Sequence, residues 1–306
     1  MEKQVIGRFA PTPSGRMHLG SVFAALVAWL SARSQKGQMV LRMEDLDTQR
    51  TSTAYADILM EDLSWLGLDF DIVTPPQSCR TAVYDRYFET LQELDLLYPC
   101  YCTRSQLHSV NAPHLSDGTY VYPGTCRNLT AQERSAFGRS PAWRVKVPDR
   151  VWKLTDYAQG EYTENLSADC GDFVVRRADG AYVYQLAVTV DDGEAGVTEV
   201  VRGADLLSSA PRQMYLQSLF GFPHPNYGHV PMLLAPDGRR LSKRDKDLDL
   251  GALRSRFAPA QLLGLLAYSA GLLDRNEPIS ARELITAFSW EKLGKEAITL
   301  DDGLFE

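Results

Sequence analysis

The sequence lacks a run of about 18 uninterrupted apolar residues, so it predicts no helix that crosses a membrane. Its N-terminus also lacks the basic, apolar and small-residue pattern of a signal peptide, because a strand-like run, VIGRFA, begins at Val5. There is no internal repeat and no low-complexity tail. We therefore expect a cytoplasmic globular protein with no membrane partner, a monomer whose 306 residues form one large or two modest domains.

Cysteine is scarce, and its five copies, at positions 79, 100, 102, 126 and 170, are odd in number. With 44% hydrophobic residues the chain can bury a sizeable core, so we expect thiols or metal ligands instead of a disulfide framework. The formal net charge of -7 argues against a protein that coats nucleic acid nonspecifically. An RNA partner must therefore meet a local basic patch, and the candidates are Arg176-Arg177 and the cluster from Arg239 to Lys246.

Two common nucleotide-binding motifs are missing. Neither G-x-G-x-x-G nor G-x-x-x-x-G-K-[ST] occurs, which disfavours a dinucleotide enzyme and a P-loop NTPase. The pattern nevertheless predicts a strand over 5–9, a loop to Gly20, a helix to about Arg33 and a strand over 38–43. This order is a βαβ unit, so we expect an α/β fold with a Rossmann-type parallel sheet and a ligand crevice at the carboxyl ends of its strands.

The remaining pattern divides the chain further. Between Cys100 and about Asp169, short apolar runs and turn residues predict an irregular inserted subdomain. Other segments have the periodicity of regular elements. We expect helices over 54–67, 80–96, 259–273 and 281–288, and strands over 173–177 and 181–188 joined by a hairpin-like turn.

Two segments far apart in the chain are suited to hold one triphosphate. The loop PTPSGRMHLGS, from Pro11 to Ser21, leads directly into a helix, so backbone amides and an imidazole gather at the helix's positive end. The segment RLSKR, from Arg240 to Arg244, follows a turn signal and carries several cations that could close over phosphates.

These segments resemble the two signatures of the class I aminoacyl-tRNA synthetases. RFAPTPSGRMHLGS, LRMEDLDTQR and VVRGADLLSSAPRQ are similar, in that order, to the glutamyl and glutaminyl subgroup of that family. The resemblance covers nearly the whole chain. It departs from the family at Arg240, where the second signature usually begins with lysine.

The resemblance implies a site for ATP with bound Mg²⁺. His18 would donate to a phosphate, Gly20 would let the nucleotide approach the backbone, and Ser21 completes the first signature. Lys243 would follow the β- and γ-phosphates into the transition state as its loop closes. As an isolated residue, His18 would more often be structural, and Lys243 would be an exposed lysine.

The resemblance also implies a glutamate pocket. Glutamate presents one ammonium and two carboxylates, so its pocket needs an anion and at least two cations or donors. Glu44 would pair with the ammonium, and the arginines would bind carboxylates through their planar forks. Structural ion pairs are the alternative for the arginines. The matching positions are Arg8, Phe9, Ala10, Pro11, Thr12, Glu44, Tyr184 and Arg202.

A metal-type constellation lies at Cys100, Cys102 and Cys126. Spacing alone leaves the fourth ligand open among His108, His114, Tyr120 and Tyr122, and histidine is the more usual zinc ligand. The resembling subgroup has C-x-C followed by Y-x-x-x-C, which implies Tyr122 and a structural Zn²⁺. Buried thiols without a metal are the alternative.

Only 62 residues follow Arg244, too few for the anticodon-binding domain of a full-length glutamyl-tRNA synthetase. We expect a catalytic domain over 1–99 and 171–240, an inserted zinc-binding subdomain over 100–170 that faces RNA, and a helical segment over 241–306. The resemblance then implies ATP-dependent activation of L-glutamate and its transfer to the queuosine base of tRNA(Asp). A shortened glutamyl-tRNA synthetase and a noncatalytic RNA-binding module are the alternatives.

Overall fold

Strands and helices alternate along the chain, as the α/β pattern predicts. The structure is a computed structural model that describes residues 4–107, 121–239, 241, 248–301, 303 and 305. The strands are β1 (Ile6–Phe9), β2 (Gln38–Leu41), β3 (Ile72–Val73), β4 (Leu97–Cys100), β5 (Ala142–Val145), β6 (Val151–Asp156), β7 (Gly160–Asn165), β8 (Phe173–Arg176), β9 (Glu199–Gly203), β10 (Asn226–Val230), β11 (Leu233–Leu234) and β12 (Ile298–Thr299).

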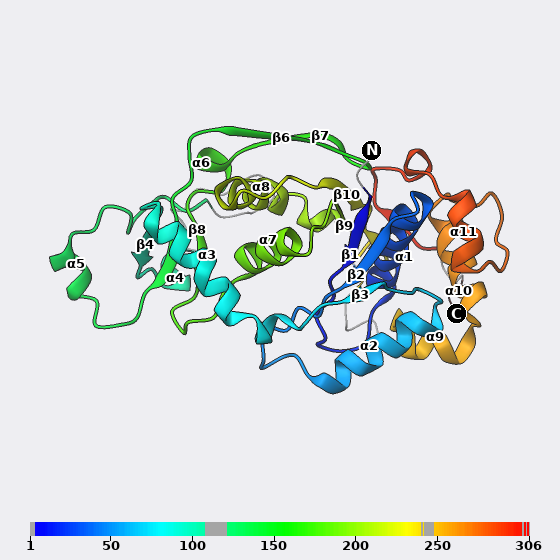
Figure 1. The fold of residues 1–306 in the computed structure, drawn as a ribbon. Helices are drawn as coiled ribbons and strands as arrows, with labels where there is room; N and C mark the ends of the chain where they lie inside the picture. The colour runs from blue at the N-terminus through cyan, green and yellow to red at the C-terminus, as the bar shows by residue number, and fades with distance from the viewer. Residues whose placement is uncertain are drawn as a thin grey trace.

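Helices connect these strands and cover them (Figure 1). The α-helices are α1 (Leu19–Ser34), α2 (Thr53–Trp65), α3 (Thr81–Glu93), α4 (Arg104–Leu107), α5 (Ala131–Ser135), α6 (Leu166–Asp169), α7 (Tyr184–Glu194), α8 (Ser209–Phe220), α9 (Leu250–Arg256), α10 (Pro259–Ser269) and α11 (Ala281–Ala287). Short 3₁₀ helices are η1 (Gln77–Cys79), η2 (Ala204–Leu206) and η4 (Trp290–Lys292).

A parallel sheet lies at the centre of the molecule. β1 pairs in parallel with β2, β2 with β3, and β9 with β10. β9 lies beside β1, where the amide of Thr198 donates to the Ile6 carbonyl at 2.9 Å and Arg8 Nη1 donates to the Val201 carbonyl at 2.9 Å. From Ile6 to Arg8 along β1, the contacted residue moves from Thr198 to Val201, so the two strands run in the same direction. The carboxyl ends of β1, β2, β9 and β10 therefore lie at one edge of the sheet. The predicted parallel sheet is confirmed.

Helix α1 packs against β1 and β9 and is buried along most of its length. Its sequence is apolar nearly all round, and a helix of that kind belongs in a core. It begins after His18, whose side chain accepts a hydrogen bond from the amide of Ser21. The predicted helix is confirmed, and its burial fixes the position of the loop that precedes it.

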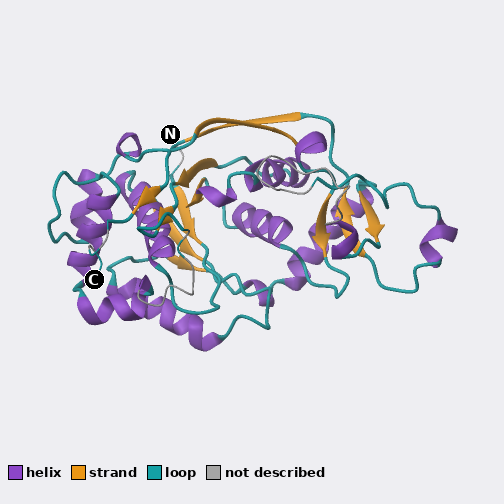
Figure 2. Ribbon diagram, turned by 180° about the vertical axis from the view of Figure 1, so that it is seen from behind, coloured by secondary structure: helices purple, strands orange, loops and turns teal. Residues whose placement is uncertain are grey.

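A second body is formed by the antiparallel sheet β4-β5-β8 and the helices α3, α7 and α8, which share a hydrophobic cluster. Figure 2 shows these helices between the two sets of strands. The hairpin β6-β7 runs along one side of the molecule, and β6 meets β10 where Asp156 pairs with Tyr227. The irregular structure expected between 100 and 169 is therefore wrong for β5, β6 and β7. Exposed and buried residues alternate along β6, as they do in a half-buried strand.

The strand predicted over 181–188 is also wrong. After the extended residue Val183, the chain forms helix α7, in which every residue from Leu186 to Asp192 is buried. Its β-branched, apolar sequence favours a strand locally, but a segment buried on all sides has no half-buried periodicity to reveal its type. The strand predicted over 173–177 is confirmed as β8.

The C-terminal part packs against α1 through α11 and through Trp290, whose indole nitrogen donates to the Ser31 hydroxyl at 3.0 Å. Helices α10 and α11 confirm the two predicted there, as α2 and α3 confirm the two predicted earlier. No helix among the described residues is both long and apolar enough to cross a membrane. The division of the chain into the three expected domains stays a prediction.

Candidate active site and cysteine cluster

The start of α1 lines a cavity of about 300 Å³ through His18, Gly20 and Ser21. The His18 ring accepts from the Ser21 amide at 3.3 Å, and its Nε2 lies 3.1 Å from the Ser21 hydroxyl. A methyl group on Gly20 would lie 3.2 Å from two atoms of that ring, so glycine leaves room for the imidazole. The helix dipole and the free amides at this end favour a negatively charged ligand.

The second predicted phosphate segment meets this cavity at Leu241, which is buried and lines it. Two segments more than two hundred positions apart in the sequence therefore border the same space. The other predicted residues of that segment, Arg240, Ser242, Lys243 and Arg244, lie outside the described residues.

Two further cavities continue from the first. One, of about 270 Å³, is lined by the predicted residues Phe9, Ala10, Pro11 and Thr12, and also by His18. The next, of about 290 Å³, is lined by Thr12, Glu44 and Tyr184. Neighbouring cavities share His18 and then Thr12 as lining residues, so the start of α1 and Glu44 border neighbouring cavities.

Glu44 follows the carboxyl end of β2, and its carboxylate is held by Arg42. Arg42 Nη2 donates to Glu44 Oε1 at 3.1 Å, and Arg42 Nη1 donates to Asp192 Oδ1 at 2.6 Å. Burial raises the pKa of Glu44, although Arg42 and Arg8 oppose the shift. The carboxylate of Glu44 is therefore positioned by a buried cation.

Arg8 belongs to the same buried network. Its Nε lies 3.5 Å from Asp192 Oδ2, and its Nη1 donates to the backbone of β9. Burial disfavours the charged form of Asp192, but Arg42 and Arg8 keep the pKa of this carboxyl below its ordinary value. Part of the Arg8 guanidinium is thus used to hold β1, α7 and β9 together.

Arg202, on β9, is 5% exposed and differs from Arg8 and Arg42 in its partners. Its Nε lies 3.0 Å from Nε2 of His229, and its Nη1 donates to Gln213 Oε1 at 2.8 Å and to the Tyr184 hydroxyl at 3.3 Å. All three partners are neutral acceptors. Among the described residues, no carboxylate lies within ion-pair distance of Arg202, and its Nη2 has no hydrogen-bond partner.

A buried charge with no carboxylate in direct contact is costly to remove from water, and here the attraction of Asp192 offsets part of that cost. Such a cation is typical of a site that awaits an anionic ligand. Tyr184, which borders the same cavity as Glu44, joins Arg202 to that cavity. The structure thus brings Arg202, Tyr184 and Glu44 together, while their roles toward a substrate stay predictions.

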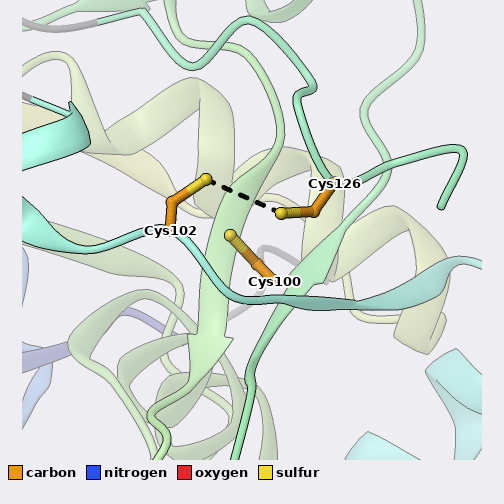
Figure 3. A group of neighbouring side chains, drawn as sticks. All are labelled: Cys100, Cys102 and Cys126. Atoms are coloured by element: carbon orange, nitrogen blue, oxygen red, sulfur yellow. Dashed lines mark hydrogen bonds between the residues drawn. The ribbon is translucent and has the colours of Figure 1, made fainter. Parts of the chain in front are cut away.

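The thiols of Cys100, Cys102 and Cys126 point toward one another (Figure 3), and their sulfur atoms all lie within 4.8 Å. The Tyr122 hydroxyl lies 3.5 Å from the sulfur of Cys100 and 3.8 Å from that of Cys102. The guanidinium of Arg144 stands 3.6 Å from the centre of the Tyr122 ring. This group of three thiols and a phenol could hold a metal ion. His108, His114 and Tyr120 lie outside the described residues.

The residues around the cysteine cluster shift the pKa values of Cys100 and Cys102 in opposite directions. Burial disfavours the thiolate of Cys100, but Tyr122 and then Arg144 lower the pKa of this thiol below its ordinary value. Burial and the neighbouring Cys100 raise the pKa of Cys102 to about 12. A thiol ligand must lose its proton to bind zinc, so a cation would have to ionise Cys102 on binding.

Comparison with known proteins agrees with this geometry. The family described as tRNA synthetases class I (E and Q), catalytic domain, matches residues 4–302. A glutamyl-Q tRNA(Asp) synthetase from Symbiobacterium thermophilum is 45% identical, over 96% of this chain and 95% of that protein. A glutamyl-Q tRNA(Asp) synthetase from Nitratidesulfovibrio vulgaris is 45% identical, over 92% of this chain and 91% of that protein. This chain belongs to the glutamyl-Q tRNA(Asp) synthetase family. The family resemblance predicted from the sequence is confirmed, and the protein is a ligase of the class I aminoacyl-tRNA synthetase type.

Solved structures agree with the family. A glutamate tRNA ligase from Elizabethkingia meningosepticum, in complex with its amino acid, superposes with a TM-score of 0.83 and 28% identity. The glutamate-tRNA synthetase from Elizabethkingia anophelis gives a TM-score of 0.84 at the same identity. Each match covers 99% of this chain, and 68% and 69% of those two chains.

Several residues of the candidate site were not found from the sequence. Asp191 and Asp192 carried a signal, because two acids inside an apolar helix must be paired with cations when they are buried. His229 lies in a short apolar run that gives no sign of a function. The residues missed are Arg42, Asp156, Asp192, Gln213 and His229.

Proposed function

We propose that the protein activates L-glutamate with ATP and transfers the glutamyl group to the queuosine base in the anticodon loop of tRNA(Asp). The observation that carries the amino-acid assignment is Arg202, a buried guanidinium whose Nη1 donates to the hydroxyl of Tyr184, a residue that lines one cavity with Glu44. A carboxylate that lines this cavity and a guanidinium one hydrogen bond behind its Tyr184 match the ammonium and the side-chain carboxylate of glutamate. The names of the curated relatives support the acceptor.

In the first step, a glutamate α-carboxylate oxygen attacks the α-phosphorus of ATP, and the bond to pyrophosphate breaks. Both reactants are anions, so the site must orient them and neutralise the charge that develops. His18, with the amides at the start of α1, would bind phosphate oxygens, and Lys243 would bind the leaving pyrophosphate. Mg²⁺ would enter with ATP.

In the second step, a hydroxyl of the modified base attacks the carbonyl carbon of the glutamyl-adenylate. A carbon–oxygen ester bond forms, and AMP leaves with the electrons of the anhydride bond. The acceptor must reach the adenylate through the cavity that Thr12, Glu44 and Tyr184 line. Arg177 and Tyr182 also line this cavity, so they are the described residues that the incoming loop would meet there.

We further propose that the cysteine cluster holds one structural Zn²⁺ through Cys100, Cys102, Cys126 and Tyr122. The three sulfur atoms lie within 4.8 Å of one another and the Tyr122 hydroxyl lies 3.5 and 3.8 Å from two of them, distances that suit four ligands of one zinc ion. The cluster joins the end of β4 to the segment around Cys126, so an ion there would hold these segments together.

The experiment that tests the function uses pure full-length protein, labelled glutamate and ATP. The acceptors are an anticodon stem-loop of tRNA(Asp) that contains queuosine, the same stem-loop with guanosine, and intact tRNA(Glu). We expect label on the queuosine stem-loop and none on its guanosine counterpart. Labelling of tRNA(Glu) at its 3' end, with the stem-loops unlabelled, would instead indicate a shortened glutamyl-tRNA synthetase.

A further inference from the structure

Behind Arg202 lies a buried chain of hydrogen bonds that the reaction does not require. Nδ1 of His229 lies 2.6 Å from Asp156 Oδ2, and Nε2 of the same ring lies 3.0 Å from Arg202 Nε. The His229 and Asp156 side chains are fully buried. Asp156, His229 and Arg202 belong to the adjacent strands β6, β10 and β9. Their hydrogen bonds therefore cross the sheet beneath the candidate glutamate pocket.

The partners of His229 fix its protonation. Arg202 Nε always carries a hydrogen, so His229 Nε2 must face it with a lone pair, and the ring hydrogen must lie on Nδ1, toward Asp156. A second hydrogen on His229 Nε2 would point at the N–H of Arg202 Nε. The protonated imidazole would also place a second positive charge beside the guanidinium. Burial and the charge of Arg202 lower the pKa of His229, although Asp156 opposes the shift. Geometry and charge therefore agree on one neutral tautomer.

Asp156 is itself held in place. Its Oδ1 accepts from the amides of Ala158, Gln159 and His229 at 2.9 to 3.0 Å. Burial disfavours ionisation, but the bonds from His229 and the backbone keep the pKa of Asp156 below its ordinary value. An ionised, immobile carboxylate is thus present to accept the Nδ1 hydrogen and to set the plane of the ring.

The neutral tautomer of His229 leaves the positive charge of Arg202 in place. A carboxylate in place of His229 would also orient the guanidinium, but it would neutralise that charge. A neutral imidazole orients it and leaves the charge available. With Nε and Nη1 occupied, the planar fork is fixed, and Nη2 is left without a partner among the described residues.

We propose that Asp156 and His229 are positioning residues for Arg202: they fix its orientation through one imidazole tautomer without neutralising its charge, so that it binds and selects the substrate's side-chain carboxylate. This inference rests on the proposed function, in which Arg202 receives that carboxylate. To that function it adds Asp156 and His229, which preserve the preference of Arg202 for a side-chain carboxylate over a neutral amide.

The sharpest test separates the two hydrogen bonds of His229. In His229→Gln, the amide oxygen can take the place of Nε2 and still accept from Arg202. In His229→Asn, the amide nitrogen can take the place of Nδ1 and still donate to Asp156, but the acceptor for Arg202 is lost. His224→Gln is a matched control, because that ring contacts the Ser218 hydroxyl at 3.0 Å, away from the candidate pocket.

Pyrophosphate exchange gives kcat and KM. For His229→Asn we expect the glutamate KM to rise by about 10-fold or more, the range for loss of a hydrogen bond to a charged group. The KM for ATP should stay near the parent value, and the preference for glutamate over glutamine should fall. His229→Gln should keep a glutamate KM within about 3-fold of the parent. Equal effects of the two substitutions, or an unchanged KM in His229→Asn, would overturn the proposal.

A second measurement needs no substitution. Nitrogen-15 NMR of the full-length, histidine-labelled protein should show one imidazole whose Nδ1 is protonated and whose Nε2 is not; the signal is assigned by its loss in His229→Gln. A doubly protonated ring, or a hydrogen on Nε2, contradicts the proposal whatever the activity.

Failure of the proposed function has a different signature. If Arg202→Met leaves the glutamate KM unchanged, Arg202 does not bind the substrate, and the proposed pocket is wrong. If Arg202→Met raises that KM while His229→Asn does not, the pocket stands and the positioning role fails.

Discussion

At the scale of single residues, the distinguishing feature is how differently the buried arginines are neutralised. Arg42 contacts the carboxylates of Asp192, Glu44 and Asp191, and Arg8 contacts Asp192. Arg202 has only neutral partners among the described residues. Arg8 and Arg42 can therefore be explained as parts of a structural network, whereas we propose that a ligand completes the surroundings of Arg202.

This difference predicts how Arg202→Met behaves. Without glutamate, the substitution removes a buried charge that has no direct ion pair among the described residues, but it also leaves His229 and Gln213 without their donor. These effects oppose each other, so the thermal unfolding temperature should change little. Glutamate should no longer raise that temperature, and the glutamate KM should increase by about 100-fold, as expected for a lost carboxylate–guanidinium contact. Differential scanning fluorimetry with and without glutamate measures the first effect, and pyrophosphate exchange the second.

Arg275→Met is the matched control, because Arg275 is 80% exposed and pairs only at the surface with Glu277. It should retain the stabilisation by glutamate. An Arg202→Met protein that glutamate still stabilises fully would show that the carboxylate binds elsewhere.

Glu44 predicts a pH dependence of substrate binding. Burial raises its pKa, so the carboxylate gains a proton as the pH falls toward that raised value, while the substrate ammonium stays charged. The glutamate KM should therefore rise as the pH falls toward the raised pKa of Glu44 and level off at high pH. Steady-state kinetics across this range test the expectation.

Glu44→Gln separates this group from the others that titrate. Its glutamate KM should be high throughout and should lack the part of the rise that Glu44 causes. A Glu44→Gln profile parallel to that of the parent protein would assign the pH dependence to another group.

Residue-scale prediction from sequence singled out side chains that lie in short, recognisable segments, as His18, Gly20 and Glu44 do, and their roles toward a ligand stay predictions. It failed for the side chains that hold them, because those pairings join distant positions. Arg42 and Asp192 are 150 positions apart, and His229 and Asp156 are 73 apart. Pairs of residues so far apart in the sequence leave no local pattern in it.

At the scale of elements, the start of α1 is the best-defined part of the candidate nucleotide site. Its sequence predicted both the helix and the loop before it, because the apolar run begins immediately after a segment rich in proline and glycine. Helix α7 shows the opposite case. Tyr184 was expected on a strand, yet it begins a helix, and tertiary burial decided that outcome.

Gly20→Ala tests the nucleotide site. The added methyl group would approach the His18 ring to 3.2 Å and displace it. We expect the KM for ATP to rise by about 10-fold, while the glutamate KM changes little. Kinetics with each substrate varied in turn measure both values.

Gly294→Ala controls for the loss of a glycine, since, apart from its chain neighbours, no described residue lies within 4 Å of the position that its methyl group would occupy. It should have parental kinetics. A Gly20→Ala enzyme whose ATP and glutamate KM values rise together would show that the substitution disturbs more than the nucleotide site.

The cysteine cluster gives a second prediction at this scale. Tyr122→Phe keeps the ring beside Arg144 but removes the phenol oxygen, so zinc should bind more weakly and dissociate at lower chelator concentration. Metal analysis after dialysis against graded chelator measures the change, and metal removal should lower the unfolding temperature.

Tyr98→Phe is a matched control, because the Tyr98 hydroxyl donates to Asp172 at 2.7 Å instead of facing the thiols. Its zinc content should match that of the parent protein. Equal zinc retention in Tyr122→Phe and the parent would mean that a different group supplies the fourth ligand.

At the scale of the whole molecule, the nucleotide and glutamate cavities lie where the central parallel sheet meets α1 and α7. The cysteine cluster lies in the smaller sheet, and α5 and α10 stand toward opposite ends of the molecule (Figure 1). The sequence predicted the parallel sheet because one βαβ unit reveals its beginning. It did not predict that β9 would lie directly beside β1, and that neighbour relation is what brings Arg202 to the site.

The exchange of labelled pyrophosphate into ATP, with pure protein and no RNA, tests most directly whether these cavities form one activation site. We predict exchange that depends on L-glutamate, that glutamine supports poorly, and that Arg202→Met loses at the same glutamate concentration. If properly folded parent protein catalyses no glutamate-dependent exchange, the proposed site does not activate this amino acid, and the assignment of Glu44, Tyr184 and Arg202 is wrong.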